Sequence, residues 1–261
     1  MTIWESTEAL GVLDAKGYTV VEAITTRDDL AAATGTHAEP NAFLGVDGKS
    51  YWVKARAQQG LVSELIAGRL AHEVGAGPNA RIIRVTPECF ASNAVIQRLV
   101  GVFCGIEHVH GVINSKDLQP LLANGSFKPD SIDPQSRAVT VVFQTWLGMA
   151  DQQLLVGVQN GRVYTIDHGE WFNDGRASLP IQMVVAPIPG VDETVGRDVN
   201  LVDVPLRRIE SLSDADLLTA VSQVPIGAEW GSPAQRRLAI GAWLAERRAN
   251  LRTVVEAWAR S

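Results

Sequence analysis

Four side chains along the sequence have the types and the order that phosphoryl transfer from ATP requires. Lys54 ends an expected strand, and Glu64 follows it on an expected helix. Asp151 comes directly after an apolar helix, and Asp167 ends the second strand of a hairpin. The reaction needs a cation on the phosphates, an anion that holds this cation, a carboxylate near the acceptor hydroxyl and a carboxylate on magnesium. We therefore expect Lys54 and Glu64 to position the phosphates, Asp151 to orient or deprotonate the acceptor, and Asp167 to bind Mg²⁺.

Each of these residues also has a purely structural interpretation. A lysine at a strand end is usually a solvated edge residue, and a glutamate on a helix usually faces water. An aspartate beside a helix end or after a strand often forms a turn. The chemical interpretation is favoured by the order of the four residues along the chain, because none of them is distinctive alone.

The first hundred residues are expected to form a mostly antiparallel sheet that carries one main helix. Asp47-Gly48 favours the positive φ angles of a tight hairpin turn, so the strand that ends at Lys54 is the second strand of a hairpin. Apolar residues at helical spacing predict the helix that carries Glu64, and Gly75, Gly77 and Pro78 end it. The expected strands span residues 17–24, 43–46, 50–55, 80–86 and 93–100, and the helix begins at residue 61.

The remaining residues are expected to be mostly helical, with one further hairpin. An apolar helix over residues 135–150 ends near Gly148, and a hairpin turned at Asn160-Gly161 leads into Asp167. A polar loop is expected over residues 173–205. Two helices follow: the first opens with Ser213 and Asp216 in capping-box spacing, and the second has Ser232 as its cap and Pro233 at its first helical position.

Two blocks of the sequence carry a family resemblance. "GTHAEPNAFLGVDGKSYWVKARAQQGLVSELIAGRLAHEVGAGP" and "VVFQTWLGMADQQLLVGVQNGRVYTIDHGEWF" resemble the HipA-like kinases, which share the wider protein-kinase-like fold. The resemblance implies an α+β fold of two lobes: an antiparallel-sheet lobe with one main helix (residues 1–104) and a mostly helical catalytic lobe (residues 105–261). It pairs Lys54 with Glu64, and it places "IDHG" where ordinary protein kinases have "DFG". Asp167 is thereby assigned to magnesium.

The resemblance also implies an activity, cofactors and partners. The chain would be an ATP- and Mg²⁺-dependent phosphotransferase acting on a protein serine or threonine, with a regulatory protein, such as an antitoxin, as a candidate partner. The family places its phosphate loop at "TGTHAEPNAF", where Gly35, Thr36 and His37 would contact the nucleotide. The alternative for this segment is a polar surface loop. The stretch 97–104 would include the linker between the lobes, whose backbone meets adenine in kinases.

The loop after Asp151 departs from the family pattern. HipA-like kinases have an asparagine there that supplies a second metal ligand, whereas this chain reads "DQQLLV". Gln153 would take the asparagine position, with Gln152 as the alternative. A glutamine oxygen can coordinate Mg²⁺, but its extra methylene shifts the oxygen in a site that tolerates little displacement. A pseudokinase that binds nucleotide or a partner without efficient transfer is therefore the competing hypothesis, and a purely structural domain is the third.

Composition excludes several other classes of protein. The chain of 261 residues has net charge -6, 46% hydrophobic residues and two cysteines. It has no basic stripe for a nucleic-acid backbone, no zinc-type cysteine spacing and no uninterrupted apolar run long enough for a membrane span. Acidic residues near the N-terminus argue against a signal peptide. We expect a cytoplasmic protein with no direct nucleic-acid or membrane binding.

His168 directly follows Asp167, and three positions are open for its side chain. It is expected either to order the metal loop, to lie near the phosphates, or simply to form a hydrogen bond with the backbone.

Overall fold

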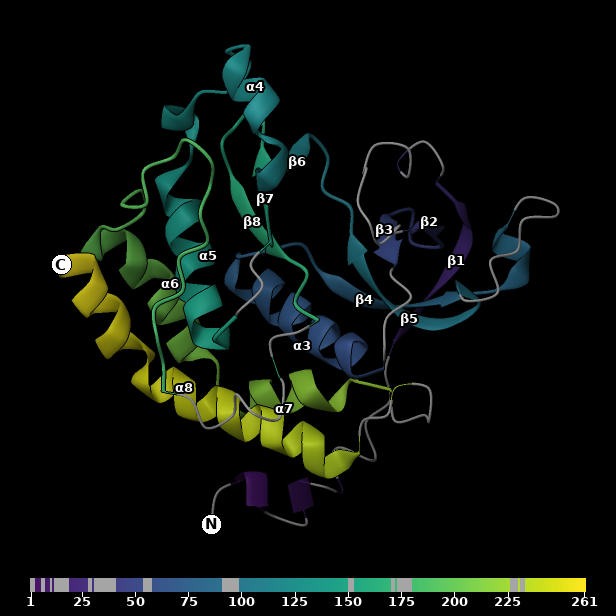
Figure 1. Cartoon of the computed structure of the whole chain (residues 1–261). Coiled ribbons are helices and arrows are strands. Elements are labelled where there is room, and N and C mark those ends of the chain that lie inside the picture. Colours follow the sequence, from purple (N-terminus) through teal and green to yellow (C-terminus); the bar gives the residue numbers. More distant parts are fainter. Residues whose placement is uncertain are drawn as a thin grey trace.

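The computed structural model describes residues 3–5, 8–9, 11, 19–27, 30, 41–53, 58–90, 99–149, 153–169, 172, 180–225, 230 and 233–261. Their fold is α+β: a closed barrel of five strands, a separate sheet of three strands, and a set of helices packed around a central helix (Figure 1). Among the described residues, no helix is both long enough and apolar enough to cross a membrane.

The strand order of the barrel is β1-β2-β3-β5-β4, and that of the small sheet is β6-β7-β8. The barrel strands are β1 (Val20–Thr26), β2 (Asn41–Gly45), β3 (Ser50–Val53), β4 (Ala80–Val85) and β5 (Gly101–Glu107). The small sheet consists of β6 (Val112–Asn114), β7 (Gln153–Gly157) and β8 (Val163–Ile166). The α-helices are α3 (Gln58–Val74), α4 (Gln119–Ala123), α5 (Pro134–Leu147), α6 (Val199–Ser211), α7 (Asp214–Ser222) and α8 (Ala234–Arg260). Short 3₁₀ helices are η1 (Ile3–Glu5), η2 (Pro87–Cys89), η4 (Ser115–Asp117) and η5 (Pro129–Ser131).

The barrel contains the predicted hairpin and closes in a way that the sequence did not predict. β2 and β3 pair antiparallel around Asp47-Gly48, and Gly48 has a φ of 77°. The pair β1·β4 is parallel and joins the two edges of an otherwise antiparallel sheet. Close approach inside the barrel depends on Gly105, because a Cβ there would lie 2.4 Å from Cγ1 of Ile83. The expected antiparallel sheet is therefore corrected to a closed barrel.

Helix α3 lies between the barrel and the other helices, as Figure 1 shows. It packs against β4 and β5 on one side and against α5, α6 and α7 on the other. From Gly60 to Ala71 its residues are buried except for the half-buried Arg69. A helix enclosed on all sides buries its polar residues too, and Ser63 and Glu64 are both buried. The position of Glu64 therefore departs from the usual solvent-facing glutamate.

The link between the barrel and the small sheet differs from the prediction. The stretch 97–104 was expected to contain this linker, but Gly101–Glu107 forms β5, and residues 108–111 connect it to β6. The strand continues because its register with β4 runs without a break from Gly101 to Ile106. The predicted lobe boundary at residues 104 and 105 thus falls inside β5. The wider division into two lobes stays a prediction.

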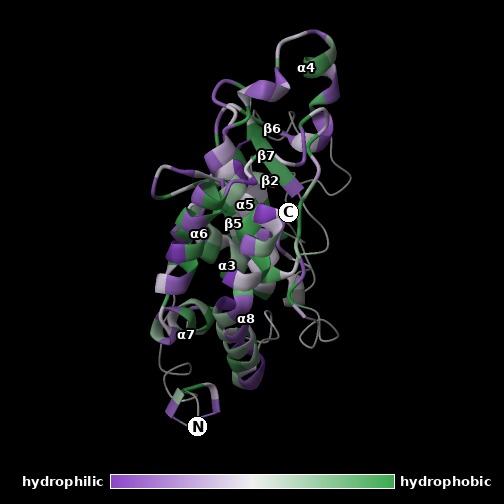
Figure 2. Cartoon of the chain, turned by 90° about the vertical axis from the view of Figure 1, so that its left-hand side faces the viewer, coloured by the Kyte–Doolittle hydropathy of each residue, from purple (hydrophilic) through white to green (hydrophobic). Residues whose placement is uncertain are grey.

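Two boundaries of the helical part also differ. The loop expected over residues 173–205 ends earlier, because α6 begins at Val199 and includes Pro205 in its interior. Pro233 occupies the N-cap of α8 instead of its first helical position. The capping box of Ser213 and Asp216 at the start of α7 is confirmed, as is the end of α5 at Gly148, which has a φ of 60°. In Figure 2, hydrophilic and hydrophobic residues are mixed along α6 and α8, whereas the residues of β7 are largely hydrophobic.

Arg247 on α8 holds the C-terminal end of α5, the helix that leads to Asp151. Its guanidinium group donates to the carbonyl oxygens of Trp146 at 2.5 Å and Thr145 at 2.7 Å, and it lies 4.7 Å from the centre of the Trp243 ring. A cation at the C-terminus of a helix complements the helix dipole. Burial lowers the pKa of Arg247 to about 10. The group therefore stays charged at neutral pH.

We expect Arg247→Met to destabilise the protein by about 2–3 kcal/mol, because two buried carbonyl groups lose a charged donor. Urea unfolding monitored by circular dichroism measures the change. Arg207→Met is the matched control: its side chain is 76% exposed and pairs only within its own helix with Asp203. Equal midpoints for the two variants would contradict the role of Arg247.

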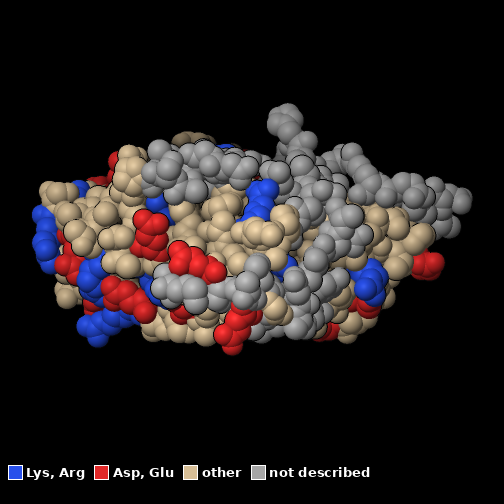
Figure 3. All heavy atoms as spheres, turned by 90° about the horizontal axis from the view of Figure 1, so that it is seen from below, with Lys and Arg blue, Asp and Glu red and all other residues tan. Residues whose placement is uncertain are grey.

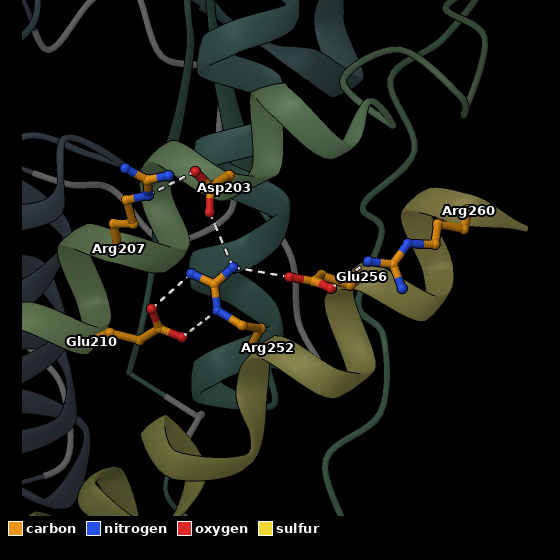
Figure 4. A network of polar contacts seen from close by, with 6 residues as sticks. All are labelled: Asp203, Arg207, Glu210, Arg252, Glu256 and Arg260. Carbon is orange, nitrogen blue, oxygen red and sulfur yellow. Dashed lines mark hydrogen bonds and ion pairs between the residues drawn. The ribbon is translucent and has the colours of Figure 1, made fainter.

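A network of ion pairs joins α6 to α8 (Figure 4). Arg252 binds Glu210 through Nε at 2.7 Å, and its Nη1 lies 3.0 Å from Asp203 and 2.9 Å from Glu256. Figure 3 shows that basic and acidic side chains also alternate at one end of the underside of the molecule. The pKa of Glu256 is lowered, mainly by the hydrogen bond that Arg252 donates to it. The pKa of Arg252 is raised by the hydrogen bonds that it donates to Glu210, Glu256 and Asp203.

We expect Arg252→Met to cost about 1 kcal/mol of stability at neutral pH and low salt. Because the folded-state pKa of Glu256 is lowered, its contribution is complete above its ordinary pKa of 4.5 and is lost as the pH falls through the lower folded value. The difference between wild type and variant should therefore shrink on acidification and at high salt. Thermal unfolding across pH and salt measures it. Lys128→Met is the control, since Lys128 is exposed and lies before η5, away from α6 and α8.

Candidate functional site

Asp167 and Gln153 meet where β8 ends and β7 begins. Gln153 pairs with Ile166 in the antiparallel register, so Asp167 follows directly beyond the last pair. The side-chain nitrogen Nε2 of Gln153 donates to Oδ2 of Asp167 at 2.7 Å. Asp167 has a φ of 61°, and it is the sole non-glycine residue with positive φ among those that the structure describes. A left-handed conformation at such a residue is uncommon and is often found where a side chain is aimed at a function.

The sheet face that leads to this pair is half-exposed. Side chains directly opposite one another in an antiparallel sheet lie on the same face, as do alternate residues along a strand. Leu155 and Tyr164 form one such opposite pair, and Ile166 and Gln153 form the next. These four side chains are partly exposed, whereas Leu154, Val156, Val163 and Thr165 on the other face are buried. An apolar, partly open surface therefore ends at Gln153 and Asp167.

Glu64 reaches the residue that follows Asp167. Its Oε1 accepts a hydrogen bond from the main-chain N–H of His168 at 3.1 Å. Both side chains are buried. The two residues are 104 positions apart in the sequence, and the packing of α3 against the end of β8 brings them together. Glu64 and the segment that carries Asp167 therefore lie next to each other.

Gly77 permits this close approach. The main-chain N–H of Thr165 donates to the carbonyl oxygen of Ala76 at 2.8 Å, in the turn that follows α3. A Cβ at Gly77 would lie 2.6 Å from the carbonyl oxygen of Thr165. The sequence predicted that Gly75 and Gly77 end the helix. It did not reveal that Gly77 also leaves room for β8.

The ring of His168 is buried beneath the site. Its Nε2 lies 3.4 Å from Oγ1 of Thr165, and its Nδ1 lies 3.7 Å from Oε1 of Glu64. The ring also packs edge-on against Phe143, with centroids 5.9 Å apart. A ring that is 1% exposed does not reach bound phosphates, so the expectation that His168 lies near them is corrected. Thr165 and Gln144, which extend this contact into α5, were not singled out from the sequence.

Several predicted site residues lie outside the described residues. They are Lys54, Asp151, the alternative ligand Gln152, and Gly35, Thr36 and His37 of the expected phosphate loop. The pairing of Lys54 with Glu64 therefore stays a prediction. Of the candidates that the structure describes, Glu64, Asp167 and Gln153 lie together. Phe172, five residues after Asp167, packs against Trp243 of α8 with ring centroids 5.6 Å apart.

Comparison with known proteins identifies the fold. No family model matches the chain, and no curated protein matches it in sequence. Among solved structures, the proinflammatory kinase CtkA of Helicobacter pylori matches 93% of this chain and 98% of its own, with a TM-score of 0.55 and 12% identity. The chain has a protein-kinase-like fold. The FAT and kinase domain of CtTel1 (TM-score 0.40, 13% identity, 85% of this chain and 21% of that chain) and the open conformation of CtTel1 (0.41, 12%, 85% and 11%) match less well and add no argument.

The residues of this kinase-like site suit Mg²⁺. Asp167 offers a carboxylate, and the bond that Gln153 donates through its nitrogen leaves its amide oxygen for another partner. Mg²⁺ prefers oxygen ligands, keeps several waters and is usually held by one or two carboxylates together with substrate phosphates. No group of three or more His, Cys, Asp or Glu residues suited to a metal occurs within the described part of the chain. A small set of oxygen donors is therefore what the site provides.

We expect Gln153→Glu to change stability in opposite directions with and without metal. Two carboxylates at the distance of the present hydrogen bond repel each other in the free protein, whereas a divalent cation between them is bound more tightly. The melting temperature should fall without metal and rise more steeply with added Mg²⁺ than that of wild type. Gln153→Met keeps the side-chain length without the polar atoms and should weaken the Mg²⁺ response. An identical Mg²⁺ response in all three proteins would contradict a metal site here.

Proposed function

We propose that the chain is an ATP- and Mg²⁺-dependent phosphotransferase of the HipA-like type that phosphorylates a protein serine or threonine. The observation that carries the proposal is the hydrogen bond between Glu64 and the residue after Asp167, within a fold similar to that of a kinase. It brings Glu64 next to the segment that carries Asp167, and both belong to the four residues whose order pointed to phosphoryl transfer. The resemblance of the blocks around Lys54 and Asp167 to HipA-like kinases supports a protein acceptor.

The proposed roles rest on the order of the residues along the sequence and on the resemblance to HipA-like kinases, and they agree with the described positions of Glu64, Gln153 and Asp167. Asp167 and Gln153 would hold Mg²⁺, which when bound would supply positive charge that neutralises the charge developing on the phosphates. Glu64 would anchor Lys54 on the phosphates, and Asp151 would orient the acceptor hydroxyl and take its proton. Gly35, Thr36 and His37 would surround the phosphates with backbone and side-chain donors.

The half-exposed face of the small sheet would receive the nucleobase. Leu155 and Ile166 present apolar surface next to Gln153 and Asp167, and Tyr164 adds an aromatic ring on the same face. A flat apolar base packs on such a surface, while the charged phosphates extend toward the metal ligands. A cytoplasmic location and a regulatory protein partner, with an antitoxin as candidate, belong to the same proposal.

Transfer of labelled γ-phosphate from ATP, to the protein itself or to proteins of a lysate, tests the function. We expect transfer by wild type in the presence of Mg²⁺, and losses of at least about 100-fold for Asp151→Ala and Asp167→Ala, because each removes a group needed for transfer. Asp130→Ala is the matched control, since Asp130 is exposed on η5. It should transfer as wild type does.

Thermal stabilisation by Mg²⁺ and ATP, measured on the same preparations, separates the alternatives. A ligand that binds only the native state raises the melting temperature, and the rise grows with the logarithm of the ligand concentration once this exceeds the dissociation constant. Stabilisation without transfer would identify a pseudokinase and overturn the proposed catalysis. Neither stabilisation nor transfer would leave a structural domain with a kinase-like fold.

A further inference from the structure

A chain of buried polar side chains runs from α5 to α3 beneath Asp167. Gln144 donates through Nε2 to Oγ1 of Thr165 at 3.1 Å, Thr165 lies 3.4 Å from Nε2 of His168, and Nδ1 of His168 lies 3.7 Å from Oε1 of Glu64. All four side chains are at most 5% exposed. Polar groups are costly to bury unless they bind one another, so a linked set of four in an otherwise apolar core indicates a role beyond packing.

The hydrogen bonds of this chain have one consistent direction. The amide nitrogen of Gln144 can only donate, so the hydroxyl of Thr165 accepts there and has its own proton for the ring. Nε2 of His168 then accepts, and the ring proton lies on Nδ1, which faces Oε1 of Glu64 at 3.7 Å, beyond hydrogen-bond distance. His168 thus connects Thr165 to Glu64 through two of its own groups: the ring binds Thr165, and the main-chain N–H binds Glu64.

This set of buried polar side chains holds the peptide group between Asp167, the proposed metal ligand, and His168 from two sides. The main-chain N–H of His168 is bound by Glu64, and the His168 ring is bound by Thr165 from the last part of β8. The orientation of this peptide determines ψ of Asp167, whose φ is already 61°. A residue in the sparsely populated left-handed region keeps this conformation only when its surroundings enforce it. The direction of the Asp167 carboxylate therefore depends on its neighbour.

We propose that His168 is a positioning residue that connects Thr165 to Glu64 and thereby fixes Asp167 for metal binding. The inference rests on the proposed function, because it takes Asp167 as the metal ligand. It assigns a second role to Glu64, which accepts the His168 N–H in addition to anchoring Lys54. It also couples the position of α3 to the affinity for metal. Glu64 of α3 binds the peptide group between Asp167 and His168, and the orientation of this group directs the Asp167 carboxylate.

Three substitutions separate the two ring nitrogens of His168. The side-chain nitrogen of Asn overlaps the position of Nδ1, so His168→Asn keeps a donor toward Glu64. The terminal amide of Gln overlaps the position of Nε2, so His168→Gln keeps an acceptor for Thr165. His168→Phe keeps a ring of similar size against Phe143 and loses both nitrogens. His72→Phe, an exposed histidine on α3, is the control.

Binding of Mn²⁺ alone, followed by electron paramagnetic resonance, is the first readout. We expect the affinity to fall about 10-fold in His168→Phe, since loss of a group that orients a ligand has effects of this size, and to fall less in the Asn and Gln variants. Hydrogen exchange of the residue-168 amide, followed by NMR, is the second readout and should accelerate in His168→Phe. In the transfer assay, His168→Phe should raise the Mg²⁺ concentration needed for half-maximal rate, whereas a general loss of folded protein would lower the rate at every concentration.

The two proposals fail in different ways. Wild-type affinity for Mn²⁺ and wild-type exchange of the residue-168 amide in His168→Phe would overturn the positioning role, whatever the transfer assay shows. If wild type binds no Mn²⁺, Asp167 is not a metal ligand, and both the proposed function and the positioning role are overturned. If Mn²⁺ binding responds to His168 as expected but γ-phosphate transfer is absent, the positioning role holds and the proposed catalysis fails.

Discussion

The contact between α3 and the end of β8 is the constraint on which the rest of the site depends. Oε1 of Glu64 binds the N–H of His168, and the carbonyl of Ala76 binds the N–H of Thr165, so the helix and the strand are joined at two points. Such main-chain contacts tolerate little displacement, because a buried N–H without an acceptor costs free energy comparable to a lost hydrogen bond. The segment that carries Asp167 is therefore held partly by a helix that packs against the barrel.

Helix α3 is itself held by polar contacts from the helical part. Arg69 of α3 donates to the carbonyl of Gln223 after α7, and Arg208 of α6 donates to the carbonyl of Val74 at the end of α3. Trp230, fully buried, donates to the carbonyl of Val102 in β5. These contacts join helix to helix and helices to barrel. The position of Glu64 is thus set from both sides by contacts within the protein.

The local elements were predictable because short-range chemistry determines them. Asp47-Gly48 and Asn160-Gly161 mark hairpin turns, and Ser213 with Asp216 marks a capping box, all within a few residues. Closure of the barrel through the parallel pair β1·β4 depends on contacts between distant segments, which no local pattern records. The burial of His168 has the same origin. Its sequence neighbours suggested a residue near the phosphates, but packing against Phe143 of α5 decides its position.

The contact between Gln153 and Asp167 shows what the sequence predicts about this site and what only the structure reveals. The resemblance to HipA-like kinases placed Gln153 where that family has asparagine, and its longer side chain argued that the amide oxygen would be displaced. The register of β7 and β8 places Gln153 opposite Ile166, one residue short of Asp167. The additional methylene spans that offset and brings the amide to 2.7 Å from the carboxylate. The length of the glutamine side chain therefore carries its amide past the last residue pair of the two strands to Asp167, and its nitrogen is the atom that faces the carboxylate.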